Sequence, residues 1–205
     1  VLSEKLKVSL DKIKFENGNF SCNKKNYTLA EISSLLDKEK EILNSYGSWA
    51  PEQGSFTYPN GTHICELEIN KNTGEVKIVA YSVVDDFGNV INPMLLEGQV
   101  HGGIVQGIGQ ALYEETLYDT KTGQLLSGSF MDYALPRASD VPNFKFKYNQ
   151  IPCKSNLLGV KGAGEAGAIG APPAVINAIC NALDIVHIDM PAKPEKIWNI
   201  LKEKY

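Results

Sequence analysis

Glu165 is the only acidic residue in a glycine-rich stretch that runs from Leu158 to Ile179. The glycines of this stretch are Gly159, Gly162, Gly164, Gly167 and Gly170. Glycine has no Cβ atom, so its backbone can turn sharply or come close to a bound group. The neighbouring side chains are almost all apolar, so we expect a partly buried carboxylate, and burial raises a carboxylate's pKa toward values useful for a general base. The stretch therefore predicts an active-site loop in which Glu165 is the base.

Two other interpretations of this stretch compete with an active site. Residues 162–167 fit the Gly-x-Gly-x-x-Gly fingerprint of dinucleotide-binding oxidoreductases, with Asp184 at a suitable distance downstream. In that fingerprint the helix begins inside the glycine run, whereas Pro172 and Pro173 predict a later helix start, because proline is favoured in the first helical turn. The remaining interpretation is an ordinary glycine-rich loop with a solvated glutamate, and residue spacing alone favours it.

A second candidate segment surrounds a helix that we expect from Gly102 to about Leu117. Gly103, Gly107 and Ala111 recur every four residues on one side of it. Each glycine inside a helix costs about 1 kcal/mol relative to alanine, so such a stripe indicates close packing against another backbone. Gln99 stands just before this helix, where free N–H groups favour acceptor-rich ligands, although spacing alone favours an ordinary surface residue.

His63 and Cys65 lie two residues apart in an alternating segment, so they share one face and could bind a metal. No third or fourth ligand is near them in the sequence, so two packing residues are the favoured interpretation. The four cysteines are widely scattered and form no Cys-x-x-Cys motif. This pattern indicates reduced thiols in a reducing compartment.

Three sequence blocks resemble, in the same order, the molybdenum hydroxylases of the xanthine dehydrogenase/aldehyde oxidase family. The blocks are Asp85–Pro93 together with Glu97–Ala111, then Gly128–Arg137, and then Lys161–Ala178. The resemblance covers the sequence from roughly Asn60 to its end, and it is strongest for the large subunits of aerobic-type carbon monoxide dehydrogenases. Three blocks in the family's order are a specific signal, whereas any one alone would be weak.

The resemblance implies a molybdenum centre on a molybdopterin cofactor, in bacteria usually the cytosine dinucleotide form. It implies that Glu165 is the catalytic glutamate, which activates the attacking oxygen. Residues that match the family's cofactor-binding positions are Gly98, Gln99, Lys161, Gly162, Ala163 and Gly164. Gln99 would lie beside the metal centre or the pterin, and the backbone of 161–164 would line the cofactor. Iron–sulfur clusters and FAD on partner domains or subunits would carry the electrons away.

The family's large subunits are several times longer than this sequence. A Gly-Gly-x-Phe-Gly cofactor loop and the loop that shapes the substrate pocket have no counterpart here, and in carbon monoxide dehydrogenases the second loop carries a copper-binding cysteine. The substrate therefore stays open among CO, an aldehyde, a purine and another heterocycle. The expected partners are the remainder of the large subunit, iron–sulfur and flavin subunits and a small-molecule substrate. The alternative function is a folded, non-catalytic fragment or scaffold that is inactive without the rest of the subunit.

Composition argues against several other classes of protein. Of 205 residues, 43% are hydrophobic and 21% are charged, as in ordinary soluble globular proteins. The net charge of −4 and the absence of a basic stripe argue against nucleic-acid binding. The most apolar run, 166–188, contains two prolines and Asp184, so we predict a buried loop and helix and no membrane span. No signal peptide is visible, and a cytoplasmic location is expected.

The expected elements alternate without regularity, which favours an α+β fold. The resemblance implies the fold of the second molybdenum-cofactor-binding domain of the hydroxylases. We expect a small α+β subdomain over 1–45, then a connecting segment over 46–61, and a cofactor-binding subdomain with the glycine-rich loop over 62–205. The aromatic rings of the connecting segment are expected to pack on the body of the protein.

Local signals predict individual elements. Asn17-Gly18 predicts a hairpin turn, and Thr28 with Glu31 predicts a capping box for a helix that runs toward Ile42. The other expected elements are a hairpin of 62–70 and 75–84, a strand over 144–148, an apolar helix from Pro172-Pro173, a short strand over 186–188 and a helix from Pro194.

Overall fold

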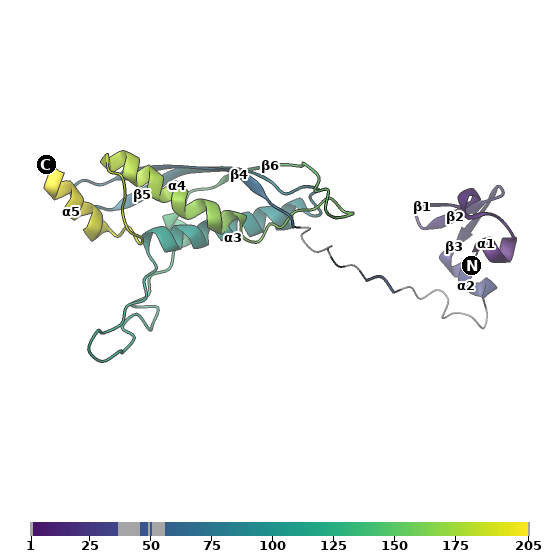
Figure 1. Ribbon diagram of the computed structural model, residues 1–205, viewed down its shortest axis with the longest axis horizontal. Coiled ribbons are helices and arrows are strands. Elements are labelled where there is room, and N and C mark those ends of the chain that lie inside the picture. Colours follow the sequence, from purple (N-terminus) through teal and green to yellow (C-terminus); the bar gives the residue numbers. More distant parts are fainter. Residues whose placement is uncertain (1, 37–45, 49, 51–55, 205) are drawn as a thin grey trace. The chain divides into compact units, whose positions relative to one another are not determined.

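The computed structural model describes residues 2–36, 46–48, 50 and 56–204. The chain divides into two compact units, Val1–Ala50 and Pro51–Tyr205, called the N-terminal and C-terminal units. The division falls inside the connecting segment that the sequence predicts over 46–61. Figure 1 labels the helices and strands of both units.

The N-terminal unit contains a three-stranded antiparallel sheet in the order β1-β2-β3. Its elements are α1 (Leu2–Leu6), η1 (Leu10–Lys12), β1 (Lys14–Glu16), β2 (Asn19–Cys22), β3 (Lys25–Thr28) and α2 (Leu29–Leu35). Asn17 and Gly18 have φ angles of 49° and 77°, which confirms the predicted two-residue turn. The capping box is also confirmed, because Thr28 Oγ1 accepts from the Glu31 N–H and Glu31 Oε2 accepts from the Thr28 N–H. The predicted extension of α2 toward Ile42 lies outside the described residues.

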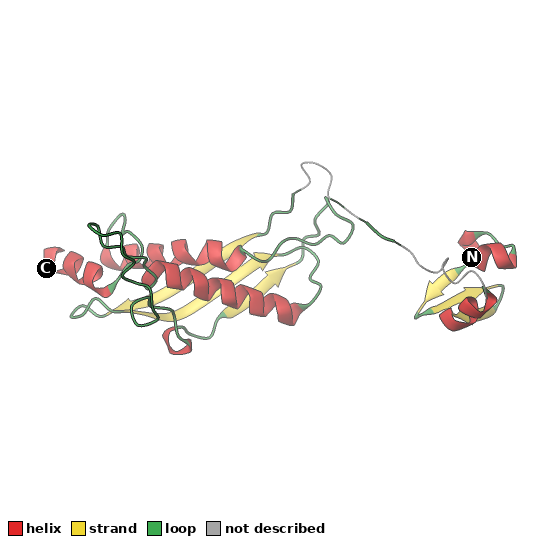
Figure 2. Ribbon diagram, turned by 90° about the horizontal axis from the view of Figure 1, so that it is seen from below, coloured by secondary structure: helices red, strands yellow, loops and turns green. Residues whose placement is uncertain are grey.

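The C-terminal unit is a three-stranded sheet with two long helices side by side across one face (Figure 2). The strands are β4 (Asn60–Ile69), β5 (Val76–Asp86) and β6 (Lys145–Asn149), and the helices are α3 (Pro93–Leu112), α4 (Ala166–Leu183) and α5 (Pro194–Lys204), with a short η3 at Ala138–Asp140. β4 and β5 form the predicted antiparallel hairpin. β6 is the strand predicted over 144–148, and it pairs parallel to β5. The mixture of helices and strands confirms the α+β fold.

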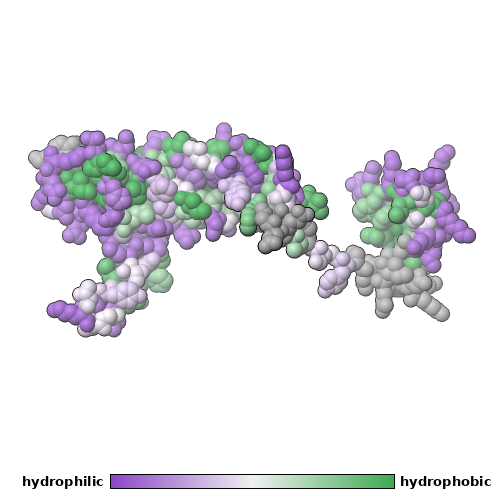
Figure 3. Space-filling model, viewed as in Figure 1, coloured by the Kyte–Doolittle hydropathy of each residue, from purple (hydrophilic) through white to green (hydrophobic). Residues whose placement is uncertain are grey.

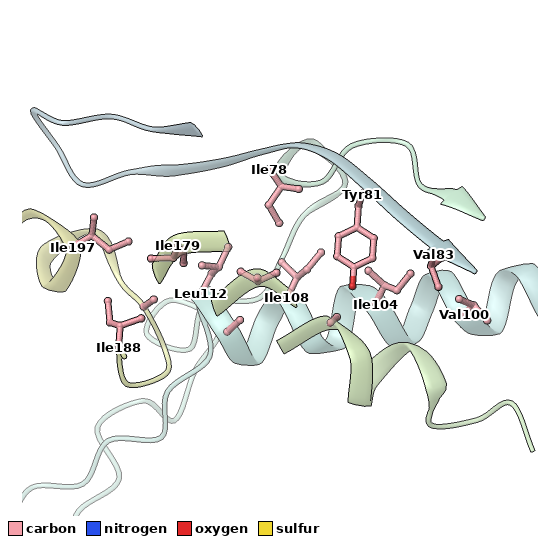
Figure 4. Packing of buried hydrophobic residues seen from close by; sticks show 14 of the residues in the cluster. Ile78, Tyr81, Val83, Val100, Ile104, Ile108, Leu112, Ile179, Ile188 and Ile197 are labelled. Atoms are coloured by element: carbon pink, nitrogen blue, oxygen red, sulfur yellow. The ribbon is translucent and has the colours of Figure 1, made fainter. Parts of the chain in front are cut away.

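The core of this unit fills the space between the sheet and its helices (Figure 4). Its largest fully buried side chains are Tyr81, Val83, Val100, Ile104, Ile108, Val175, Ile179 and Ile197. Full burial of one such aliphatic side chain is worth about 1.5–3 kcal/mol. Ile197 and Leu201 attach α5 to this core, which confirms the helix predicted from Pro194. The core therefore holds the sheet, α3 and α4 in fixed positions relative to one another.

α3 begins nine residues before the predicted start at Gly102, so that prediction is wrong. Asn92 is its N-cap and accepts a hydrogen bond from the Leu95 N–H at 3.1 Å, and Pro93 occupies the first helical position. An asparagine cap followed by proline is a standard helix start, because proline lacks the N–H that would otherwise have no partner there. The helix ends at Leu112 rather than near Leu117.

α4 also begins earlier than predicted. It starts at Ala166, directly after its N-cap Glu165, so Pro172 and Pro173 lie inside the helix instead of at its start. Proline inside a helix normally costs about 3 kcal/mol, because it removes a hydrogen bond and its ring presses on the preceding turn. Here the cost is offset by packing, since Pro172 itself is buried against Gly107 of α3 and Val175 follows in the core.

Glycine allows α3 and α4 to touch backbone to backbone. A Cβ atom on Gly103 would lie 3.0 Å from the Gly167 Cα, and one on Gly107 would lie 2.7 Å from the Ala171 Cβ. Gly167 is tighter still, because its Cβ would lie 2.6 Å from the Val100 carbonyl oxygen. The close packing that the small-residue stripe predicts is therefore confirmed, and its partner is α4.

We expect Gly167→Ala to destabilise the protein by about 3 kcal/mol, because the added methyl group meets backbone atoms that cannot turn aside. Urea unfolding followed by circular dichroism measures this loss. Gly164→Ala is the matched control, since a Cβ there meets no atom within 4 Å, and its effect should be under about 0.5 kcal/mol. Equal losses in the two variants would contradict the importance of the helix contact.

Two further predictions are wrong. Residues 186–188 form no strand, since none of the described strands pairs with them, and the chain there bends from α4 toward α5. Phe56 and Tyr58 of the predicted connecting segment, which belong to the C-terminal unit, are largely exposed, so their rings are not buried in the body of that unit. The same prediction for Trp49 lies outside the described residues.

By length and composition alone, α4 is long and apolar enough to cross a membrane. The core helix of a soluble fold passes the same test, and α4 packs along α3 and β4. Its fully buried residues Ala171, Val175 and Ile179 face that core. Packing inside the fold is therefore a sufficient explanation for its composition.

Candidate functional site

The glycine-rich loop lies at the end of the sheet where β5 ends and where α3 and α4 begin. Gly88 and Val160 form an isolated β-bridge, and the Lys161 N–H donates to the Phe87 carbonyl oxygen at 2.9 Å. The Asn89 side chain adds a hydrogen bond to the Leu158 carbonyl oxygen at 2.8 Å. The segment after β5 therefore holds residues 158–161 in place and leads the chain into Glu165.

Asp86, the last residue of β5, connects three segments of this site through hydrogen bonds and an ion pair. Its Oδ1 accepts from the Gly88 N–H at 2.9 Å and from the Ile151 N–H at 3.1 Å, and its Oδ2 pairs with the Lys161 ammonium. Burial alone would raise the pKa of Asp86, but the hydrogen bonds from Lys161, Gly88 and Ile151 outweigh it and hold that pKa below its usual range. The Lys161 side chain is thus engaged within the protein, which leaves its backbone as the part that can face a cofactor.

Gln99 reaches the same loop from α3. Its Nε2 donates to the Gly164 carbonyl oxygen at 3.1 Å, across 65 residues of sequence. Gln99 lies in the second turn of α3 and not before the helix, so the predicted contribution of free N–H groups beside it is wrong. The carboxamide itself, however, stands against the glycine-rich loop, beside the predicted cofactor-binding residue Gly98.

Glu165 is the N-cap of α4, and its side chain makes no capping hydrogen bond. It is exposed, so the burial that the sequence predicts for this carboxylate is wrong for this chain. Of the apolar neighbours that suggested burial, Ala171 and Val175 turn into the core as part of α4, whereas Ile169 is exposed. Glu165 lines a cavity of about 440 Å³ whose other walls include His63, Asp85 and Ile169.

Three glycines of the site have open space where a side chain would be. A Cβ atom on Gly98, Gly102 or Gly164 would meet no atom within 4 Å, and none of these residues has a positive φ angle. Gly162 is nearly as open, with only Thr57 Oγ1 at 3.9 Å. Nothing in the described part of the chain requires glycine at these positions, whereas a group lying flat on the backbone would. The loop therefore fits a cofactor held by backbone groups.

Some features that the sequence singles out do not form a site. The described residues contain no group of three or more histidine, cysteine and acidic side chains that could hold a metal. His63 instead bonds the Tyr81 hydroxyl through Nδ1 at 2.8 Å. Burial, with a smaller contribution from Glu66, raises the pKa of the Cys65 thiol to about 11, so this thiol stays protonated.

Of the arguments against dinucleotide binding, one fails in the structure and another holds. Because α4 begins at Ala166, the helix does begin inside the glycine run, contrary to the prediction. The fingerprint also requires a preceding strand in a parallel sheet, with crossover helices between the strands. In the described C-terminal unit the loop follows only the isolated bridge at Val160, and β4 and β5 are antiparallel. The fold therefore still argues against dinucleotide binding.

Sequence reasoning missed the role of Asp86 and of Thr57, whose Oγ1 accepts from the Gly162 N–H at 3.2 Å. The Asp85-Asp86 pair at the end of an apolar strand was an available signal, since acidic residues are rarely buried there without a partner. Thr57 offered no such signal.

Comparison with known proteins assigns the chain to a family. Residues 1–142, which include Gly98 and Gln99 but not the glycine-rich loop, match the model described as "Molybdopterin cofactor-binding domain". The chain belongs to this family. The sequence-based recognition is thereby confirmed.

Individual relatives can be aligned with most of this chain. The carbon monoxide dehydrogenase large chain of Hydrogenophaga pseudoflava is 36% identical over 73% of the chain and 19% of its own length. The nicotine 6-hydroxylase large subunit of Paenarthrobacter nicotinovorans is 42% identical over 76% of the chain and 19% of its own length. A crystal structure of the Cu,Mo-CO dehydrogenase matches 98% of the chain and 26% of its own chain, with a TM-score of 0.85 and 29% identity. The chain thus spans about a fifth of these curated relatives.

Proposed function

We propose that this cofactor-binding domain is the C-terminal part of the large, catalytic subunit of a molybdenum hydroxylase, with Glu165 as its base. The observation that carries the proposal is the hydrogen bond from Gln99 to Gly164. It joins the two predicted cofactor-binding segments one residue away from Glu165. The relatives are oxidoreductases by name, which supports the same reaction class.

The residues of the chain have separate roles in this proposal. The cofactor, when bound, supplies the two-electron redox chemistry. The backbone of Lys161, Gly162, Ala163 and Gly164 would line the cofactor, and the open space beside Gly98 and Gly164 would let it approach. Gln99, whose Nε2 donates to the Gly164 carbonyl oxygen, would offer its carboxamide oxygen to the bound group. Glu165 would take a proton from the oxygen nucleophile as that oxygen attacks the substrate.

Exposed apolar residues near the site support a partner polypeptide. Two loops that hydrogen-bond each other carry Ile91, Ile151, Leu157 and Leu158, and all four side chains are exposed. Hydrophobic surface of this kind marks interaction sites, and Figure 3 shows such surface on the C-terminal unit. We propose that the remainder of the large subunit covers these residues, and shields Glu165 from water as well.

The finer assignments follow from the same family membership. We propose the cytosine dinucleotide form of the cofactor, iron–sulfur and FAD subunits as electron acceptors, and a cytoplasmic location. The substrate class is CO, an aldehyde or a nitrogen heterocycle. Enzymes that act on these substrates differ in the loop that shapes the substrate pocket, and that loop has no counterpart in this sequence. We therefore propose that the remainder of the subunit determines the substrate.

Molybdenum content tests the proposal. The 205-residue chain is purified alone and after co-expression with the remaining part of a large subunit, and molybdenum is measured by elemental mass spectrometry. We expect about one molybdenum per co-purified complex, and less on the chain alone because it supplies only part of the cofactor contacts. Metal on the chain alone would also support a cofactor-binding role. Absence of metal from both samples would overturn the proposal in favour of a non-catalytic scaffold.

A further inference from the structure

Three polar side chains lie together beneath the cavity that Glu165 lines. His63 on β4 bonds the Tyr81 hydroxyl through Nδ1 at 2.8 Å, and its Nε2 lies 3.4 Å from Asp85 Oδ2. Tyr81 and Asp85 both belong to β5. His63 and Asp85 share the cavity wall with Glu165, whereas the Tyr81 side chain is completely buried behind them.

Burial of His63 and Asp85 side by side costs free energy. Their side chains are 7% and 3% exposed, and Asp85 Oδ2 has no hydrogen-bond partner among the described residues. A buried carboxylate without full pairing costs several kcal/mol. Among the residues that the structure describes, His63 is the only group within 4 Å of Oδ2 that can carry a positive charge. A polar arrangement retained at such a cost indicates a role beyond packing.

Two glycines leave room for the His63 and Asp85 side chains. A Cβ atom on Gly170 would lie 2.6 Å from the His63 ring, and one on Gly61 would lie 1.8 Å from Asp85 Oδ1. Gly170 belongs to the second turn of α4, five residues after the N-cap Glu165. The imidazole is therefore wedged against the helix that carries Glu165, and it can move little.

The surroundings suit His63 to gaining and losing a proton. Burial raises the pKa of the Tyr81 phenol far above its ordinary range, with smaller contributions from Cys65 and Asp85, so this hydroxyl keeps its proton. It can then donate to Nδ1 when the imidazole is neutral and accept from it when the imidazole is charged. The Asp85 carboxylate lies 3.4 Å from Nε2, where it can pair with the imidazolium. The titratable groups that face His63 are Tyr81 and Asp85 from β5, Cys65 from its own strand and Glu165 across the cavity.

We propose that His63 receives the proton that Glu165 takes up during turnover, through water in the cavity, and that Asp85 stabilises the resulting imidazolium. In this step the Glu165 carboxylic acid loses one proton and becomes a carboxylate, and the His63 imidazole gains one. No electrons change place. The cavity of about 440 Å³ has room for water molecules to bridge the two groups. The step rests on the proposed function, since it requires Glu165 to be the base.

The test in the loaded enzyme compares His63→Gln with His187→Gln. The control histidine also pairs with an aspartate, Asp189, but on the exposed surface. We expect kcat of His63→Gln to fall about 100-fold with little change in KM, as for a lost proton-transfer group, and His187→Gln to match the wild type. In His63→Ala, added imidazole should restore at least about tenfold of the loss, which a purely structural defect would not allow.

A second readout needs no activity. NMR of the histidine rings in the 205-residue chain reports the environment of each His63 ring nitrogen, and Asp85→Asn should change the Nε2 signal, because the carboxylate 3.4 Å away becomes a neutral amide. An unchanged Nε2 signal, or wild-type kcat in His63→Gln, would overturn the relay while leaving Glu165 as the base. Wild-type activity in Glu165→Gln would instead overturn the proposed function, and the relay with it.

Discussion

Glu165→Gln should reduce turnover of the assembled enzyme by at least about 1,000-fold and leave its molybdenum content unchanged. General-base catalysis is worth roughly 100- to 10,000-fold, and glutamine cannot accept the proton. The fold should tolerate the change, because the Glu165 side chain makes no capping hydrogen bond and is exposed. Glutamine also keeps the length and shape of the side chain. Steady-state kinetics and elemental analysis on the same preparation measure both quantities.

Glu195→Gln is the matched control for this experiment. Glu195 is likewise an exposed glutamate at the N-terminal end of a helix, but it lies in the first turn of α5. We expect wild-type turnover from this variant. Normal turnover in Glu165→Gln would remove Glu165 from the mechanism, and joint loss of turnover and metal would make it a residue that holds the cofactor.

Asp86→Asn should destabilise the chain by about 3 kcal/mol, because it leaves the Lys161 ammonium buried without its partner. The loss should be concentrated in the site. The Asn89 and Lys161 amides, which bond Gly159 and Phe87, should exchange with solvent faster than the amides of α3. Urea unfolding and hydrogen exchange measure the two effects. In the assembled enzyme, molybdenum content should fall as well.

The contribution of Asp86 should depend on pH in a defined direction. Its pKa is lowered in the folded chain, so the unfolded chain binds protons more readily. The stabilisation is therefore present above the ordinary aspartate pKa of about 3.9 and is lost as the pH falls through the folded value. Asp189→Asn, at an exposed pair with His187, should change stability by under about 0.5 kcal/mol. Equal effects of the two variants would refute the anchoring role of Asp86.

Elements governed by local rules were predictable from the sequence. The Asn17-Gly18 turn and the Thr28–Glu31 capping box follow from backbone conformations and side-chain lengths that neighbouring residues determine alone. The hairpin of β4 and β5 follows from strict alternation around a short turn. The glycine stripe of α3 predicted a close helix contact, although the sequence did not indicate its partner.

The predicted helix starts are wrong because proline occurs both in the first turn of a helix, as in α3, and inside a helix, as in α4. Asn92-Pro93 marks the start of α3, since an asparagine cap and a first-turn proline together begin a helix. Pro172-Pro173 predicts a helix start in the same way, but these prolines lie inside α4, where burial of the residues around them allows the helix to continue. Only the contact with α3 distinguishes these cases, and that contact is not visible in the local sequence.

The sequence offers candidate residues for the site but not the geometry that brings them together. The resemblance supplied Gln99 and Glu165, and the structure brings Gln99 against the loop that ends at Glu165. The bond of Asp86 to Lys161 spans 75 residues, and the parallel pairing of β6 with β5 has no local signal. Burial of Glu165 was predicted from its apolar neighbours, but burial depends on what covers a residue from elsewhere in the chain or from a partner.

The glycine contact between α3 and α4 has a mechanical consequence. Gln99 stands one residue before Val100, whose carbonyl oxygen faces Gly167, and Gly167 stands two residues after Glu165. No side chains separate the two backbones at this contact, so α3 and α4 cannot shift past each other by side-chain rotation. The Gln99 carboxamide and the Glu165 carboxylate are therefore attached to one rigid pair of helices. In the proposed enzyme, this preorganised arrangement would spare the free energy of positioning the two groups during each turnover. Motion during turnover would then fall to the part of the large subunit that we propose covers the site.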